Sequence, residues 1–171
     1  DQPSLALTVV GVTGTSGKTS TTYFIESVLA AAGIRTARFG TIEYRFGDTV
    51  LPAAQTTPEA PELQRLLRMA VDRGFQAVVM EVSSHALDQA RCEGISFSCA
   101  IFTNLTQDHL DYHKTQENYF QSKAKLFKNL QKNSFAVINA DDRYGRRIAK
   151  LSKVKTISYG IKNNAQLTAK N

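Results

Sequence analysis

GVTGTSGKT, residues 11–19, joins a run of apolar and β-branched residues to a segment in which apolar side chains recur at helical spacing. Glycines let such a loop curl so that successive amide groups point at phosphate oxygens, and the positive end of the following helix adds to the attraction. The strict spacing G-x-x-x-x-G-K is not met, because Val12 stands at the first glycine position. A plain glycine-rich turn is the alternative, but a strand before and a helix after the loop are the context that nucleotide binding requires. The sequence therefore predicts a nucleotide-binding loop.

Outward from this loop, apolar runs alternate with segments of helical spacing along most of the chain. The predicted strands span residues 5–10, 34–42, 75–82, 97–102, 135–139 and 156–159, with a hairpin or an extended excursion over 44–50. The predicted helices span residues 18–32, 58–73, 115–130 and 143–151. Strands that alternate with helices indicate βαβ units. The sequence thus predicts an α/β fold with a three-layer, mostly parallel sheet flanked by helices, like that of P-loop nucleotide-hydrolysing proteins.

Length and composition limit the kind of protein. The 171 residues suffice for one domain, or for one domain and part of another. No apolar run approaches the roughly 20 residues that span a bilayer, so no membrane association is expected. The chain starts at Asp1 with neither a methionine nor a signal-peptide pattern, and a polar segment after Gly160 ends without completing an element. We expect residues 1–171 to be one domain, cut inside its C-terminal end, from the middle of a longer product.

The two cysteines, Cys92 and Cys99, have no histidine at ligand spacing and form no C-x-x-C motif. Buried free thiols in a reducing compartment are favoured over a disulfide, which agrees with a cytoplasmic location. The formal net charge of +6 comes largely from basic residues in the second half of the chain. Their helical spacing, without an aromatic platform, favours a solvated face over a nucleic-acid surface. A positive field would also suit a small anionic substrate.

Three polar clusters follow predicted strands: EVSSH at 81–85, TNLTQDHLD at 103–111 and NADD at 139–142. Ligands of α/β sheets bind at the carboxyl ends of the strands, where these clusters gather. Hard oxygen ligands beside a triphosphate indicate Mg²⁺ rather than zinc. Each cluster also has a structural alternative, because Asp108 and Asp111 can cap a turn and His85 can be a core or capping histidine. Their shared place at the phosphate-binding edge favours function.

Taken in order, the motifs resemble the central domain of the Mur ligases, and within that family the UDP-N-acetylmuramoyl-tripeptide synthetase branch. The resemblance covers nearly the whole chain, from about Val9 to Tyr159. The stretches EVSSH and DHLDYH discriminate more sharply than the phosphate loop. The motifs that carry the resemblance occupy residues 14–19, 56–58, 81–87, 102–113, 119–127 and 139–142.

This resemblance implies an ATP-dependent amide ligase of peptidoglycan synthesis. ATP, with Mg²⁺, would phosphorylate the D-glutamyl carboxylate of UDP-N-acetylmuramoyl-L-alanyl-D-glutamate, and the amine of a third amino acid would displace the phosphate. Diaminopimelate and lysine are both candidates for that amino acid. By the same resemblance we expect a cytoplasmic monomer that binds neither nucleic acid nor membrane.

The resemblance also assigns roles to individual residues. Lys18, Lys123 and His109 would be catalytic, and Lys123 matches a lysine that is carbamylated in the family. The expected metal ligands are Thr19, Glu81, His109 and carbamylated Lys123. The residues expected at the muramoyl substrate are Thr56, Thr57, Ser83, Gln89 and Arg91. Those expected at ATP are Gly14, Thr15, Ser16, Gly17, Lys18, Thr19, Ser20 and, at the adenine, Asn139.

Two departures bear on these expectations. Ser16 stands where the family usually has asparagine, a small polar exchange that keeps the turn. The family's N-terminal UDP-binding domain and its C-terminal domain, which completes the ATP and amino-acid sites, lie outside this chain. We therefore expect the chain alone to show no ligase turnover.

Three other functions remain open at this point. A related ligase on the same scaffold, such as folylpolyglutamate or cyanophycin synthetase, is disfavoured by Thr56, Thr57 and the substrate set that follows. A plain P-loop nucleotide hydrolase or nucleic-acid motor would place an aspartate at the Mg²⁺ site, where this chain has Glu81. A non-catalytic descendant is disfavoured because Lys18, Thr19, Glu81, His109 and Lys123 are all retained.

Overall fold

A computed structural model describes residues 2–169, which form a nine-stranded sheet of order β4-β3-β2-β5-β1-β6-β7-β8-β9. From β2 to β9 all neighbouring strands run parallel, and only the pairs β2–β3 and β3–β4 at one edge are antiparallel. The predicted mostly parallel sheet and the hairpin are thereby confirmed. The strands are β1 Thr8–Thr13, β2 Thr36–Phe39, β3 Glu43–Phe46, β4 Thr49–Pro52, β5 Ala77–Glu81, β6 Cys99–Phe102, β7 Phe135–Asn139, β8 Lys155–Gly160 and β9 Leu167–Thr168.

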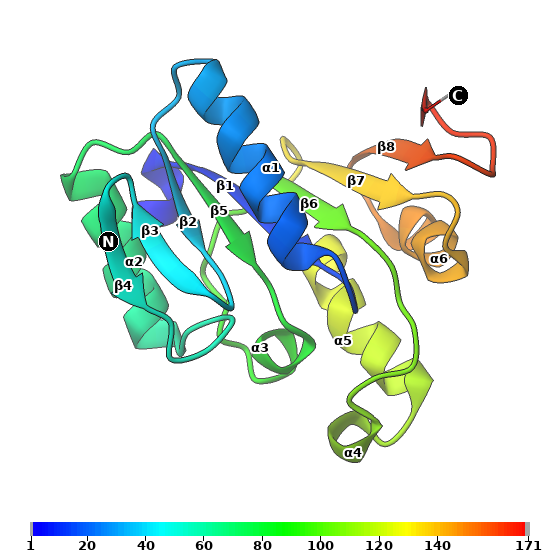
Figure 1. Ribbon diagram of the computed structural model, residues 1–171. Coiled ribbons are helices and arrows are strands. Elements are labelled where there is room, and N and C mark those ends of the chain that lie inside the picture. The colour runs from blue at the N-terminus through cyan, green and yellow to red at the C-terminus, as the bar shows by residue number, and fades with distance from the viewer. Residues whose placement is uncertain (1, 170–171) are drawn as a thin grey trace.

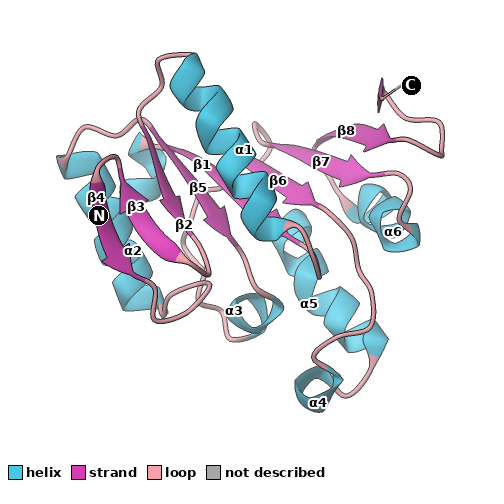
Figure 2. Ribbon diagram, in the orientation of Figure 1, coloured by secondary structure: helices cyan, strands magenta, loops and turns pink. Residues whose placement is uncertain are grey.

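Helices cover both faces of the sheet. In Figure 1, α1 (Lys18–Ala31) crosses the front of the sheet, whereas α2 (Ala60–Asp72), α5 (Gln116–Lys128) and α6 (Arg143–Leu151) lie behind it. Two short helices, α3 (Ser84–Asp88) and α4 (Leu110–His113), follow β5 and β6 near the lower edge in Figure 2. A 3₁₀ turn, Pro3–Ala6, precedes β1. The predicted three layers are confirmed.

The core divides between the two faces because side chains alternate along each strand. Val9 of β1 belongs to the larger cluster, with side chains from α2, α5 and α6, whereas Val10 and Val12 belong to a smaller cluster beside Ile25 and Leu29 of α1. Strands buried on both faces read as continuous apolar runs, which is why they were visible in the sequence.

The bounds of several elements differ from the prediction. The first strand starts at Thr8 rather than residue 5, because Pro3 begins a 3₁₀ turn that leaves Leu5 65% exposed. It also continues through Gly11 instead of stopping there. A Cβ at Gly11 would lie 2.8 Å from the ring of Phe97, so the glycine serves close packing inside the strand. The strand predicted over 34–42 is confined to β2.

Both cysteines are buried and free, as predicted. Burial raises the pKa of each thiol to about 12, so both stay protonated at neutral pH. In the part of the chain that the structure describes, no helix is long and apolar enough to cross a membrane.

Candidate nucleotide and metal site

The phosphate loop connects β1 to α1 through two glycines with positive φ. Gly14 has φ 153° and Gly17 has φ 83°. A Cβ at Gly14 would lie 1.9 Å from the Thr103 hydroxyl oxygen, so this position requires glycine. Gly17 is the N-cap of α1 and supplies no side-chain cap. The first-turn amides of α1 therefore keep the open, positive character that suits a phosphate.

The loop is fixed to the end of β6 by hydrogen bonds from both sides. The amide of Thr15 donates to the Asn104 carbonyl (2.9 Å), and the amide of Ser16 donates to the Asn104 side-chain oxygen (3.0 Å). The Thr103 hydroxyl donates to the Ser16 carbonyl (2.7 Å). Asn104 belongs to one of the sequence motifs, yet no pattern assigned it this role. Asn104 thus holds the phosphate loop against the end of β6.

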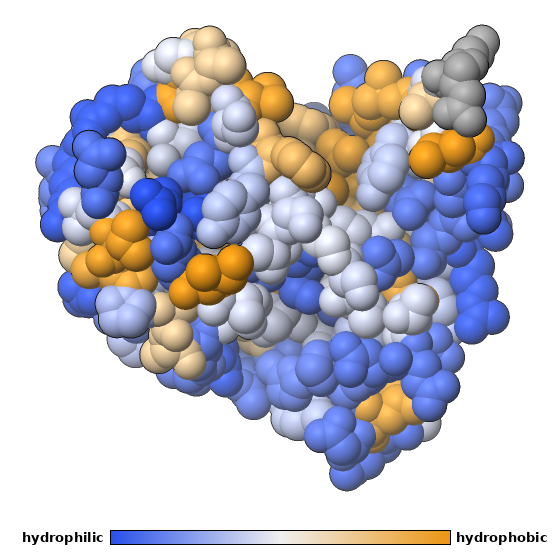
Figure 3. Space-filling model, viewed as in Figure 1, coloured by the Kyte–Doolittle hydropathy of each residue, from blue (hydrophilic) through white to orange (hydrophobic). Residues whose placement is uncertain are grey.

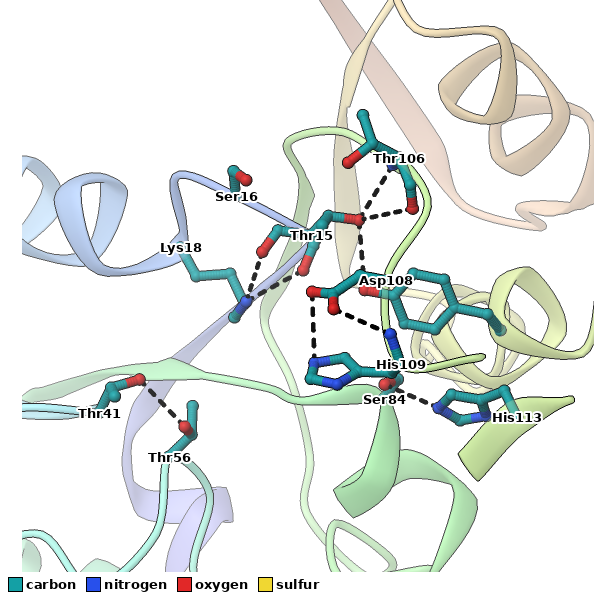
Figure 4. A network of polar contacts seen from close by, with 12 residues as sticks. Thr15, Ser16, Lys18, Thr41, Thr56, Ser84, Thr106, Asp108, His109 and His113 are labelled. Atoms are coloured by element: carbon teal, nitrogen blue, oxygen red, sulfur yellow. Dashed lines mark hydrogen bonds and ion pairs between the residues drawn. The ribbon is translucent and has the colours of Figure 1, made fainter. Parts of the chain in front are cut away.

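Lys18 lies folded over its own loop (Figure 4). Its Nζ donates to the carbonyls of Gly14 (3.1 Å) and Thr15 (3.0 Å). Burial lowers the pKa of this amine, and the negative charges of Glu81 and Asp108 oppose that shift. An ammonium group has three donors, so Lys18 keeps hydrogen-bonding capacity for a phosphate oxygen at the same place.

Lys123, on α5, is 1% exposed, which is unusual for a lysine. Its Nζ donates to the Gly14 carbonyl (2.9 Å) and lies 4.5 Å from the centre of the Tyr119 ring. Burial, reinforced by the positive charge of Lys18, holds the Lys123 pKa well below its ordinary value. A lysine in such surroundings favours the neutral amine, which is nucleophilic.

Glu81 ends β5 and is 1% exposed. Its Oε1 accepts hydrogen bonds from the Thr19 hydroxyl (2.9 Å) and from the Thr41 amide (2.9 Å). Its Oε2 accepts one from the Thr41 hydroxyl (3.1 Å). The Thr19 and Glu81 oxygens therefore converge beside the phosphate loop. Hard oxygen donors beside a phosphate site fit Mg²⁺, so these residues suit the predicted ion.

The other two expected metal ligands both contact one aromatic ring. His109 and Lys123 lie against Tyr119, at 6.0 Å between ring centres and 4.5 Å from Nζ to the ring. The Tyr119 hydroxyl lies 3.2 Å from the Thr15 hydroxyl, which brings this ring to the phosphate loop. His109 is half exposed, and its Nε2 is 3.5 Å from an Asp108 oxygen. Among the described residues, no three His, Cys, Asp or Glu side chains gather as a metal cage, so these donors form no zinc-type site.

A buried chain of hydrogen bonds joins Ser84, His113 and Ser122 beside the site. His113 Nε2 lies 2.9 Å from the Ser84 hydroxyl, and His113 Nδ1 lies 3.4 Å from the Ser122 hydroxyl. These contacts join α3 to α5 through the end of α4. Burial lowers the pKa of His113, and the charge on His85 lowers it further. Both ring nitrogens face hydroxyl groups rather than carboxylates, so the folded protein favours the neutral ring.

This histidine gives the protein a predictable pH dependence. The folded His113 has a pKa below the ordinary 6.5, so the unfolded chain takes up its proton first as the pH falls. The free energy of unfolding should therefore decrease from about pH 7 downwards, by at most about 1.4 kcal/mol per pH unit for one proton, and level off below the folded pKa. Urea denaturation of the wild type and of His113→Gln between pH 5 and 8 checks this. The slope should be shallower in the variant, and equal slopes would contradict the prediction.

The residues predicted at the muramoyl substrate lie together beside β5. The Thr57 hydroxyl donates to the Glu81 carbonyl (2.9 Å) and accepts from the Ser83 amide (3.0 Å), and Thr57 is 1% exposed. The Ser83 hydroxyl caps α3. Arg91 donates to the side chain of Gln89 and to the Thr57 carbonyl. Thr57 and Ser83 thus have structural roles here, whereas Gln89 is exposed and the Arg91 guanidinium is paired with Glu59 (2.9 Å).

In the third polar cluster, residues 139–142, both aspartates have structural roles. Asp142 accepts the amides of Tyr144 (2.7 Å) and Gly145 (3.2 Å) and so caps α6. Asp141 accepts backbone amides of residues 161–163. Asn139 donates to the Thr103 carbonyl (2.7 Å) and borders a cavity of about 680 Å³ that Tyr159 and Gly160 also line. A cavity of this size beside Asn139 fits a nucleobase.

Figure 3 shows the face of the molecule on which α1 lies. Hydrophilic and near-neutral residues fill the lower middle of this face, where Figure 1 shows α1 beginning and β6 ending. Polar surface there agrees with a ligand that is mostly phosphate and carboxylate.

Comparison with known proteins agrees with this geometry. The family model of the Mur ligase middle domain matches residues 12–171. The UDP-N-acetylmuramoyl-L-alanyl-D-glutamate–2,6-diaminopimelate ligase of Geobacter metallireducens is 53% identical over 173 aligned positions, which cover 98% of this chain and 34% of that protein. The ligase of the same name from Synechococcus elongatus is 55% identical over 148 positions, covering 86% and 30%. The chain thus spans about a third of the length of these relatives.

Solved structures give the same result. A structure of a UDP-N-acetylmuramoyl-L-alanyl-D-glutamate–2,6-diaminopimelate ligase superposes with a TM-score of 0.83 at 32% identity, covering 96% of this chain and 34% of that one. Folylpolyglutamate synthase of Mycobacterium tuberculosis, complexed with ADP, has a TM-score of 0.72 at 15% identity over 94% and 45%, which shows a shared fold alone. On its sequence, its fold and its phosphate loop, the chain belongs to the Mur ligase family and is a middle domain of that family.

Proposed function

We propose that this chain is the ATP-binding middle domain of a ligase that adds diaminopimelate to UDP-N-acetylmuramoyl-L-alanyl-D-glutamate. The observation that carries the proposal is the buried Glu81 carboxylate, 2.9 Å from the Thr19 hydroxyl and beside the phosphate loop. The names of the 53% and 55% identical relatives favour diaminopimelate over lysine. The predicted cytoplasmic location, monomeric state and position of residues 1–171 inside a longer, three-domain protein remain predictions.

The phosphate loop and Lys18 would bind and orient the triphosphate. ATP supplies the phosphoryl group that activates the D-glutamyl carboxylate, and Mg²⁺ neutralises charge on the phosphates. Repulsion between a triphosphate and a carboxylate opposes their encounter, so positive groups at the meeting point lower the barrier. Lys18 provides one such charge from the loop, and the amides that begin α1 add their dipole. Thr19 and Glu81 would hold the ion from the protein side.

Lys123 would act as a carboxylate rather than as a cation. Its buried amine, with a lowered pKa, is the nucleophile that reaction with CO₂ requires. The carbamate would place a negative charge where the free amine is neutral, and would complete a second set of ligands with His109. The 4.5 Å contact with Tyr119 and the bond to Gly14 hold the amine at this place.

The remaining residues would position the substrates. Arg91 has a planar guanidinium that can bind two oxygens of a carboxylate or diphosphate, and Gln89 orients it at 2.8 Å. Thr56, Thr57 and Ser83 would shape the same side of the muramoyl site. Asn139 would contact adenine, and Ser16 and Ser20 would lie along the phosphates.

Phosphate release tests the proposal. A protein carrying this chain at the full length of its relatives should release phosphate from ATP and Mg²⁺ only when both the muramoyl dipeptide and diaminopimelate are added. Lysine, glutamate and other amino acids serve as the panel of controls. Release that ignores the muramoyl dipeptide would overturn the substrate assignment.

The 171-residue chain alone should give no multiple turnover under the same conditions. By the family resemblance, a C-terminal domain completes the ATP and amino-acid sites, so the middle domain lacks part of each. Steady product formation by the purified chain, measured over many enzyme equivalents, would contradict this prediction.

A further inference from the structure

Thr41 lies just beyond the carboxyl end of β2, and none of the sequence motifs includes it. It contacts Glu81 through two separate donors, its amide to Oε1 (2.9 Å) and its hydroxyl to Oε2 (3.1 Å). One residue therefore binds both carboxylate oxygens. Two such hydrogen bonds fix the rotation of the carboxylate about its terminal bond, a torsion that is otherwise soft.

The preceding residue makes this close approach possible. A Cβ at Gly40 would lie 2.4 Å from Glu81 Oε1, so a side chain at that position would displace the carboxylate. The same Oε1 accepts from the Thr19 hydroxyl at 2.9 Å. The Glu81 carboxylate is thus held between the end of β2 and the start of α1, with two hydrogen bonds from Thr41 and one from Thr19.

The hydrogen-bond directions can be assigned from donor counts. Thr41 Oγ1 donates to Glu81 Oε2, so the single hydroxyl proton of Thr41 points to Glu81. Thr41 Oγ1 also lies 3.0 Å from Thr56 Oγ1, as Figure 4 shows. Because the Thr41 proton is already used, Thr56 is the donor in that contact. The order is therefore Thr56 to Thr41 to Glu81.

We propose that Thr41 is a positioning residue that orients the Glu81 carboxylate toward Mg²⁺ and links it to the substrate-side loop through Thr56. This inference deepens the proposed function and rests on it, because Glu81 must be a metal ligand. Hydrogen bonds in a chain polarise one another, so the Thr56 contact strengthens the bond from Thr41 to the carboxylate. If an anionic group of the substrate accepted the hydrogen bond of the Thr56 hydroxyl, Thr56 would no longer donate to Thr41. Substrate binding would then weaken the bond from Thr41 to Glu81, and so couple the substrate site to the metal site.

Mg²⁺ affinity of the protein at the full length of its relatives, with saturating ADP, tests the proposal, with Mn²⁺ electron paramagnetic resonance as a second readout. Thr41→Val removes the hydroxyl and keeps the shape and the amide. It should weaken Mg²⁺ binding about tenfold or more, the range seen when a partner of a metal ligand is lost. Thr41→Ser retains the hydroxyl and should stay within about threefold of wild type, on the same principle.

A matched control lies on the same strand. Thr36 is at the other end of β2, and its hydroxyl donates to the Ile34 carbonyl, so Thr36→Val removes a strand hydroxyl without touching Glu81. Its Mg²⁺ affinity should equal that of wild type. Thr41 is exposed, so Thr41→Val should keep the fold, and a thermal unfolding curve verifies this. Thr41→Ala serves if the valine variant unfolds.

Thr56→Val, alone and combined with Thr41→Val, tests the link between Thr56 and Thr41 independently. If Thr56 acts through Thr41, the double variant should bind Mg²⁺ no more weakly than Thr41→Val alone, because the two losses are not additive. Additive losses would overturn the link to Thr56.

The Glu81→Gln variant distinguishes the metal-ligand role of Glu81 from the positioning role of Thr41. It should weaken Mg²⁺ binding at least as much as Thr41→Val. Wild-type affinity in Thr41→Val, with binding lost in Glu81→Gln, would overturn the role of Thr41 and leave the proposed function standing. Wild-type affinity in Glu81→Gln, or no Mg²⁺-dependent ADP binding by the full-length wild-type protein, would overturn the metal assignment and the inference together.

Discussion

Lys18→Met should lower kcat/KM for ATP-dependent ligation by about a hundred- to a thousandfold in the full-length protein, the usual range when one pre-placed charge-stabilising donor is lost. Methionine keeps the length of the side chain and removes the ammonium that lies over the loop carbonyls at 3.0 and 3.1 Å. Charge on the transferring phosphoryl group then loses a fixed positive neighbour. Initial rates of phosphate release across ATP concentrations measure the change.

Lys128→Met is the matched control for this prediction. Lys128 is an exposed lysine at the end of α5 whose Nζ donates to Gln121, away from the loop. Its removal should leave kcat/KM unchanged. A Lys18→Met enzyme within about threefold of wild type would show that the loop lysine does not stabilise the transition state.

Arg38→Ala should reduce the free energy of unfolding by about 3 kcal/mol or more, the effect of removing one partner from a buried ion pair. Arg38, on β2, is 1% exposed and binds Glu26 of α1 (2.6 Å) and Glu43 of β3 (2.9 Å). Its guanidinium also stacks 3.5 Å from the centre of the Tyr23 ring. The alanine leaves Glu26 without its cation, leaves Glu43 with Arg45 alone (2.8 Å), and opens an unfilled space between α1 and the sheet. Urea denaturation at pH 7 measures the loss.

Arg65→Ala provides the comparison. Arg65 and Glu62 form an exposed pair on α2, with side chains 57% and 42% exposed. An exposed pair is worth at most about 1 kcal/mol, so this variant should unfold close to wild type. Equal losses in Arg38→Ala and Arg65→Ala would mean that the buried network adds nothing beyond a surface pair.

The sequence predicted those elements whose side chains are buried at regular spacing. β7 (Phe135–Asn139) and α6 (Arg143–Leu151) have the predicted bounds, because an apolar run and an Asp142 cap mark their ends. The helices α3 and α4 are shorter than two turns, so no periodicity could reveal them. The start of β1 was wrong because local proline geometry at Pro3 prevailed over the apolar run.

Some residues of the candidate site could also be identified from the sequence, and others could not. Thr19 and Glu81 were identified because each belongs to a motif that carries the family resemblance, and the fold brings their side-chain oxygens within 2.9 Å of each other. The roles of Thr41 and Asn104 depend on the approach of segments 40 and 88 residues away, which a single sequence does not record. Asp141 and Asp142 show that a strand-end position alone does not separate a cap from a ligand, because both accept backbone amides.

The two buried cysteines make the chain convenient for spectroscopic work. Burial raises the pKa of both thiols far above neutral pH, so both stay protonated, and the thiolate is the reactive form. Thiol-specific maleimide and nitroxide reagents should therefore not react with Cys92 and Cys99. A cysteine introduced in an exposed loop could then carry a single fluorophore or spin label with no need for a cysteine-free background, and the movements of that loop would be read without altering the interior.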